Sequence, residues 1–221
     1  MKKKIVLYDM SVGGWGAVEY LEIFRKAIHF LPRVVVVAFY SGNDALESFF
    51  VAYSDERWSS LRPDPSITAR DAPRVPFPAP RSEWWTVTFQ NGQTVTFTPR
   101  LRLAANQDHP AVEAGYGVMR EAAKLMADMA AAVGIKMVFT VIPTKELVYA
   151  PRIAQEGIEA PDAYRRLVEA EAARISSLID SLKQTGQAQV VDTVLPLQRA
   201  AKEGKSLYPE NENGHPLRGG Y

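Results

Sequence analysis

The run of apolar residues over 34–40 (VVVVAFY) most constrains what this chain can fold into. A short apolar run without polar alternation is typical of a strand covered on both faces, as in parallel sheets. The run leads into Gly42-Asn43-Asp44, and ligands in open α/β sheets bind beyond the carboxyl ends of the strands. These three residues therefore either line a site or form only a turn, because Gly, Asn and Asp are also common turn residues.

The residues before this run complete a strand–helix–strand unit. Residues 5–10 predict a strand, and a glycine-rich turn over 12–16 (VGGWG) leads into an amphipathic helix over 17–30. The second strand is predicted over 33–40, and two strands joined by such a crossover lie parallel. The remaining pattern predicts helices over 45–58, 110–133, 161–184 and 194–203, and strands over 136–142 and 188–192. The expected fold is one three-layer α/β domain over residues 1–221 with a mostly parallel sheet.

Residues 61–108 depart from this pattern and predict an insertion. Six prolines between residues 61 and 82 exclude regular structure there. Residues 84–98 then alternate with period two around Asn91-Gly92, which is a strong hairpin signal. Trp84 and Trp85 at its start either form a platform for a glycan or a partner, or pack the insertion onto the domain.

Composition excludes several classes of protein and site. The chain has 221 residues, a net charge of +1 and no cysteine. The balanced charge gives no field that would select nucleic acid, and the absence of cysteine excludes disulfides, thiolate zinc sites and a cysteine nucleophile. No apolar stretch predicts a transmembrane segment, and the apolar run after the N-terminal lysines is too short for a signal peptide. The compartment and the oligomeric state stay open.

Few residues suggest metal or cofactor chemistry. Of the three histidines, His29 lies late in a predicted helix, His109 precedes a helix as a surface or capping residue, and His215 stands in a Gly-His-Pro turn. No pair of histidines has metal-ligand spacing on a predicted helix, so we expect no metal. No complete phosphate-binding motif follows the first strand, so we expect no nucleotide cofactor.

Lys145 and Glu146 follow the strand predicted over 136–142, where functional residues collect in α/β proteins. We expect them to form a structural ion pair that holds the loop. A functional role is the alternative.

Three segments together resemble the SGNH/GDSL hydrolase superfamily, whose domain has a flavodoxin-like α/β fold. Asp9 to Gly14 (DMSVGG) resembles the block whose glycine donates its backbone N–H to the oxyanion hole, which implies this role for Gly14. Gly42-Asn43-Asp44 resembles the Gly-x-Asn-Asp block, which implies that Asn43 donates its side-chain amide. Asn213-Gly214-His215-Pro216 resembles the block with the general base, which implies that role for His215. The resemblance does not cover residues 61–108. Within the superfamily, the chain is similar to the bacterial branch that is related to polysaccharide O-acetyl esterases and acetyltransferases.

The chain departs from this family in two places. The family nucleophile is a serine in a Gly-Asp-Ser block, and no serine precedes Asp9 here. We expect that this block is missing, and that Ser11 lies in the wrong block to replace it. The acid that orients the histidine is Glu212 in one register of the motif and Asn213 in the other, and an asparagine cannot stabilise an imidazolium electrostatically.

The resemblance implies an SGNH-type ester hydrolase or O-acyltransferase that acts on acyl esters of small molecules or glycans without a cofactor. Preorganised donors such as Asn43 and Gly14 would stabilise the oxyanion of acyl transfer. Without the nucleophile block the chain itself is expected to be weak or inactive. Two alternatives stay open: a non-catalytic SGNH-like domain that binds a glycan or partner, and an unrelated α/β protein.

Overall fold

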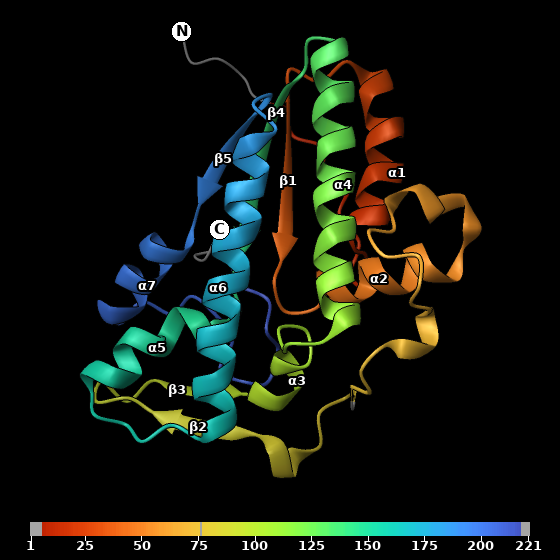
Figure 1. Ribbon diagram of the computed structural model, residues 1–221. Helices are drawn as coiled ribbons and strands as arrows, with labels where there is room; N and C mark the ends of the chain where they lie inside the picture. The colour runs from red at the N-terminus through yellow and green to blue at the C-terminus, as the bar shows by residue number, and fades with distance from the viewer. Residues whose placement is uncertain (1–5, 76, 218–221) are drawn as a thin grey trace, which may run out of the picture.

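Three parallel strands form the central sheet of the computed structural model, which describes residues 6–75 and 77–217 (Figure 1). They are β1 (Val34–Tyr40), β4 (Lys136–Ile142) and β5 (Ala188–Asp192), in the spatial order β1-β4-β5. Val34 pairs with Lys136 and Tyr40 with Ile142, so β1 and β4 end side by side. The predicted α/β class with a parallel sheet is confirmed, as are the strands predicted around these three segments.

Helices α1 (Ala17–Ala27), α4 (Pro110–Ala132) and α6 (Asp162–Gln184) cover one face of this sheet. Figure 1 shows α4 and α6 lying lengthwise along the strands, with α1 beside α4. Alternate strand residues such as Val37, Phe39 and Phe139 are buried beneath these helices. Burial of each such side chain contributes about 1.5–3 kcal/mol, so this face holds the main core. Helix α2 (Asp44–Ser54) packs against α4 and extends that core.

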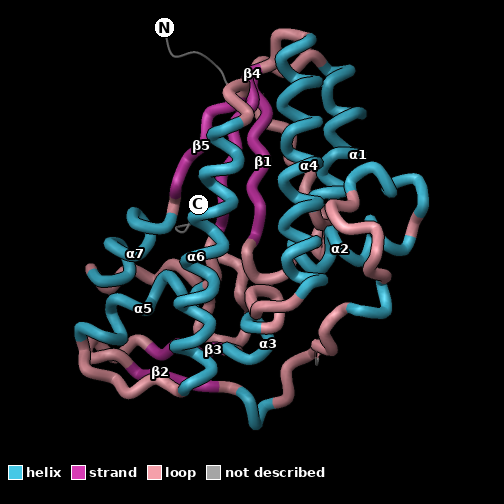
Figure 2. Tube along the Cα trace, in the orientation of Figure 1, coloured by secondary structure: helices cyan, strands magenta, loops and turns pink. Residues whose placement is uncertain are grey.

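The opposite face of the sheet is open, which corrects the expectation of three layers. Val34, Val36 and Val191 alternate with the buried residues and are 48%, 62% and 41% exposed. Helices α5 (Lys145–Gln155) and α7 (Val194–Lys202) pack against each other near the carboxyl ends of the strands (Figure 2). Within the described ranges no helix covers these three valines. The strand over 34–40 is therefore apolar on both sides but buried along its length on only one.

The strand predicted over 5–10 does not form in residues 6–10, and residue 5 lies outside the described residues. Val6, Leu7 and Tyr8 are exposed, and none of the described strands pairs with them. A strand needs a neighbour that exchanges backbone hydrogen bonds with it, so apolar character alone does not create one. As a result, β1 is an edge strand of the described sheet.

The insertion contains the predicted hairpin, in which β2 (Trp85–Thr88) pairs antiparallel with β3 (Thr94–Phe97). The proline-rich residues before it form only short 3-10 turns, at Ala69–Asp71 and Arg81–Glu83. Phe89 stacks on Tyr149 of α5, and Phe97 packs edge-on against Tyr164 of α6. The insertion thus builds a second apolar core, and α3 (Pro99–Leu103) leads the chain back to the sheet.

Two other helical predictions differ from the structure in detail. The helix predicted over 45–58 is α2 followed by a 3-10 turn at Glu56–Leu61, and α1 likewise ends in a 3-10 turn at Ile28–Phe30. Helix α5 was not predicted, and it contains Pro151 in its interior. The long helices and α7 agree closely with their predictions, and no described helix is long and apolar enough to cross a membrane.

The open edge of β1 predicts self-association. An unpaired strand edge beside exposed apolar side chains is a template for pairing with another chain. We expect Val36→Lys to reduce self-association, measured by light scattering over a concentration series. Val133→Lys is the matched control, because Val133 is also an exposed valine, at 51%, but follows α4 and belongs to no strand. Equal scattering by the two variants would mean that the chains do not associate through the edge of the sheet.

Candidate functional site

Three segments that lie far apart in the sequence meet around the carboxyl end of β1. Residues 41–44 continue from the strand, Gly16 lies against the first turn of α2, and the loop over 209–217 lies on Tyr40. Ser48 joins the first two segments, since its hydroxyl accepts from the Ala17 N–H at 2.8 Å and donates to the Asp44 carbonyl at 2.5 Å. The segments that carry the predicted site residues are thus neighbours in the fold.

His215 lies over the last residue of β1. His215 is an exposed residue whose imidazole packs at a tilt against the ring of Tyr40, with ring centroids 4.7 Å apart, and the Tyr40 hydroxyl donates to the Gly214 carbonyl at 2.9 Å. A side chain at Gly214 would collide with that hydroxyl and with the Arg102 guanidinium. Burial lowers the pKa of His215 below its usual 6.5, and the charge of Arg102 lowers it further. The imidazole is therefore neutral near neutral pH and can accept a proton.

Asn43 is the N-cap residue of α2 and lies half-buried at the same strand end. Its side chain makes no capping hydrogen bond, while its backbone carbonyl accepts from the Glu47 N–H at 3.0 Å. Only glycine fits at position 42, because a side chain there would collide with the ring of Tyr40. The amide of Asn43 does not cap the helix and instead lies beside the Glu47 carboxylate, where its hydrogen bond opposes the rise in the pKa of Glu47 that burial causes.

Asp44, in contrast, has a structural role. It is buried, and its Oδ2 accepts from the Tyr40 N–H at 2.8 Å and from the Tyr20 hydroxyl at 3.0 Å. Burial raises the pKa of Asp44 to about 8, against these two hydrogen bonds. Within the Gly-Asn-Asp triplet, Asp44 thus fixes the turn, while the Asn43 side chain lies half-buried beside Glu47.

Gly14 lies in an exposed turn before α1, with a φ of 81° that favours glycine. Its N–H makes no hydrogen bond to another described residue. Ser11, in the same segment, donates its hydroxyl to the Asp9 carboxylate at 2.7 Å. No described hydroxyl hydrogen-bonds to the His215 imidazole, so residues 6–75 and 77–217 give this base no nucleophile to activate.

The two predicted acid partners of His215 do not contact its imidazole. Asn213 Oδ1 accepts from the His215 backbone N–H at 3.0 Å and so shapes the turn. Glu212 is exposed, and its carboxylate forms no hydrogen bond or ion pair with a described residue. In this arrangement neither residue orients the ring.

Lys145 and Glu146 do not form an ion pair with each other, contrary to expectation. Both are fully buried at the start of α5. Lys145 donates to the Asn211 carbonyl, and Glu146 Oε1 accepts from the Thr98 N–H at 2.9 Å. Burial lowers the pKa of Lys145 to about 8, although nearby carboxylates oppose this shift. Each residue thus holds a different segment. Lys145 holds the loop over 209–217, called the histidine loop below, and Glu146 holds the chain that follows β3.

Glu171 of α6 is the main site residue that the sequence analysis missed. Its carboxylate is fully buried and accepts from the Thr144 N–H at 2.7 Å, the Thr144 hydroxyl at 2.6 Å and the Ser41 hydroxyl. Burial raises the pKa of Glu171 to about 7. The available signal was its position on the apolar face of the helix, at helical spacing from Leu167 and Ile175.

The histidines and acids outside this region give no metal site within the described residues. His109 caps α4 as predicted, since its Nδ1 accepts from the Ala111 N–H at 3.2 Å. In the part of the chain that the structure describes, no three His, Asp or Glu side chains are grouped so that they could hold a metal ion. No protein-family model, curated protein or solved structure matches this chain.

The buried acids predict that stability falls as pH rises. The folded-state pKa values of Glu171 and Asp44 are about 7 and about 8, above their usual 4.5 and 3.8. The contribution of the two acids to the free energy of unfolding is fully present below their usual pKa values. It is lost as pH rises through their folded-state pKa values, and the loss is roughly 2 kcal/mol or more. Glu171→Gln mimics the protonated acid, so we expect it to flatten the pH dependence of urea unfolding between about pH 5 and about pH 8.

Glu169→Gln on the exposed face of α6 is the control for this experiment. If the Glu171→Gln variant keeps the full pH dependence of the parent protein, Glu171 does not change its protonation in this interval.

The pKa of His215 tests the geometry around the histidine loop. Because the charge of Arg102 lowers this pKa, we expect Arg102→Gln to raise it. An NMR titration of the imidazole signals measures the change. Arg100→Gln, on the same short helix, is the control. Equal His215 pKa values in both variants would show that Arg102 does not act on this ring.

Proposed function

We propose that this chain carries the general base and the oxyanion donors of an SGNH-type ester hydrolase or O-acyltransferase that acts on acyl esters of small molecules or glycans. The observation that carries the proposal is the tilted packing of His215 against Tyr40, with ring centroids 4.7 Å apart, at the strand end that leads into Gly42-Asn43. A chance resemblance of separate segments would not require them to meet. Their convergence around one strand end therefore supports the proposal.

In the proposed reaction, the hydroxyl of the nucleophile gives its proton to neutral His215 while its oxygen bonds to the carbonyl carbon of the ester. The carbonyl electrons move to oxygen, and the oxyanion accepts hydrogen bonds from the Asn43 amide and the Gly14 N–H. Loss of one such donor typically costs about 2.7–4 kcal/mol. Collapse of the intermediate releases the alcohol with the proton from His215. The acyl group then passes to water or to a second alcohol, which His215 deprotonates in turn.

The nucleophile would come from a further strand that pairs with the outer edge of β1. This strand would belong to the same or to another polypeptide. Exposed Val34 and Val36 leave apolar surface beside this edge that an added strand with its connecting helix would cover. Such a strand, parallel to β1 as β4 is, would end near Tyr40. A residue that follows it would then approach His215.

A non-catalytic binding domain is the second candidate. It is favoured by the exposed position of Glu212 and by the backbone contact of Asn213, which leave His215 without an orienting acid. Such a domain would keep the polar groups at the end of β1 without a competent base.

Slow hydrolysis of p-nitrophenyl acetate tests the proposal even in the absence of a nucleophile. Enzymes that lose their nucleophile keep a residual rate on the order of 10³-fold over water, which comes from oxyanion stabilisation and binding. We expect Asn43→Ala to lower the residual rate by about 10-fold or more, and His215→Ala to lower it as well. Asn91→Ala in the hairpin turn and His29→Ala after α1 remove the same chemical groups elsewhere and serve as matched controls.

Equal rates in all four variants would contradict the catalytic proposal and leave the binding domain. Loss of the rate in Ser11→Ala would identify Ser11 as the nucleophile and remove the need for an added strand.

A further inference from the structure

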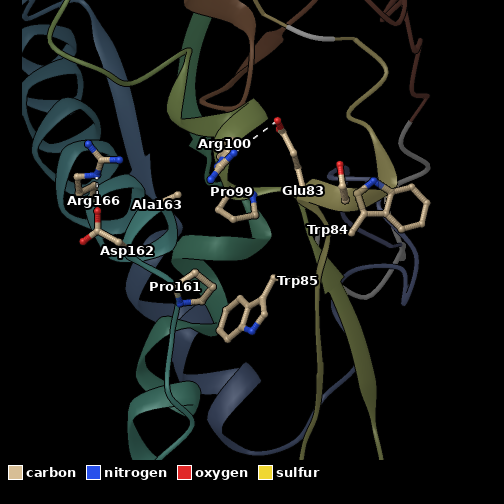
Figure 3. Close-up of a pocket in the computed structure, with 10 residues that line it drawn as sticks. Glu83, Trp84, Trp85, Pro99, Arg100, Pro161, Asp162, Ala163 and Arg166 are labelled. Carbon is tan, nitrogen blue, oxygen red and sulfur yellow. Dashed lines mark ion pairs between the residues drawn. The ribbon is translucent and has the colours of Figure 1, made fainter.

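A pocket of about 310 Å³ opens between the start of the hairpin, the start of α3 and the start of α6 (Figure 3). Helix α3 contributes Arg100 to this pocket, whereas Arg102 of the same helix lies beside the histidine loop. The pocket is thus separate from the site at the end of β1, and the proposed ester chemistry does not use it. Its volume is at the lower end of the range for small-molecule sites.

One side of the pocket is apolar and held rigidly. The Trp85 ring packs edge-on against Tyr164 with ring centroids 4.7 Å apart and lies tilted against Phe97 at 5.3 Å, and these two contacts fix its orientation. Pro99 and Pro161 also line the pocket, and Figure 3 shows Trp85 and Pro161 toward the same end of the view. Rigid aromatic and proline rings present flat surfaces at little cost in conformational entropy. Such surfaces suit the C–H face of a sugar ring.

The polar side of the pocket carries charges of both signs. Arg166 Nε lies 3.1 Å from the Asp162 carboxylate, and Arg100 Nη1 lies 3.8 Å from Glu83 Oε1. The second distance is too long for a direct hydrogen bond, so hydrogen-bonding capacity remains in this pair. Glu83 Oε2 is also buried and has no partner among the described residues. Two positive and two negative side chains cancel, so the pocket offers both donors and acceptors without selecting a charged ligand.

The geometry points to a binding site for one neutral sugar ring of a glycan. A sugar ring has an apolar C–H face for Trp85 and hydroxyls that both donate and accept for the charged pairs. The carboxylates of Glu83 and Asp162 oppose a phosphate or a uronate. A proline-rich peptide would need a groove of several open aromatic rings. Trp84 does not supply a second open aromatic ring, because its indole N–H donates to the Ala79 carbonyl at 3.1 Å and Arg81 lies over its ring.

The indole N–H signals of the four tryptophans in the NMR spectrum of the intact chain test this inference. The probes are hexamers of β-1,4-linked glucose, of N-acetylglucosamine and of galacturonic acid. We expect one of the two neutral hexamers to shift the Trp85 signal at about 1 mM, while the Trp15 and Trp58 signals stay in place. Added salt is expected to leave this binding unchanged, since no net charge is involved.

A pair of neighbouring arginines provides the matched variants. Arg165 and Arg166 both lie near Asp162, but only Arg166 lines the pocket. We expect Arg166→Ala to weaken binding about fivefold or more and Arg165→Ala to leave it unchanged.

Several results would overturn the inference. These are an unmoved Trp85 signal with both neutral hexamers at about 10 mM, a shift only with the galacturonate hexamer or with a polyproline peptide, or equal affinity in the two arginine variants.

Discussion

The buried carboxylate of Glu171 is the contact on which the site depends. A buried acid is costly unless its hydrogen-bonding capacity is filled, and here the donors come from Ser41 and Thr144. These residues follow β1 and β4, so α6 can pack on the sheet only in the register that brings Glu171 to both strand ends. The turn into residues 42–44 and the start of α5 at Thr144 follow from this one arrangement.

The histidine loop is positioned by elements that surround it rather than by its own sequence. Lys145 of α5 holds Asn211, Tyr40 of β1 holds Gly214, and β3 contributes the Thr96 N–H, which donates to the Glu210 carbonyl at 2.7 Å. These contacts fix the backbone of the loop over 209–217 and so hold His215 at the end of β1. The site is less complete on its other side, where the edge of β1 is unpaired and no described hydroxyl reaches the imidazole.

The sequence by itself determined the elements that depend on local spacing. The apolar runs over 34–40 and 136–142 predicted two strands, and period-two alternation around Asn91-Gly92 predicted the hairpin. Amphipathic spacing predicted the long helices. The site roles of Asn43 and His215 came from the resemblance of their segments to the SGNH/GDSL motifs, because locally each residue is equally typical of a turn, and these roles stay predictions.

Only the tertiary structure decided the features that depend on distant partners. Residues 6–10 have strand-like composition but no described neighbour, so they form no strand. Lys145 and Glu146 are adjacent in the sequence, yet each bonds to a segment about fifty residues or more away. Glu171 was hidden for the same reason: a carboxylate on an apolar helix face acquires its role only from the two strand ends that meet it. Local patterns specify elements, whereas the hydrogen bonds of buried polar groups specify how those elements fit together.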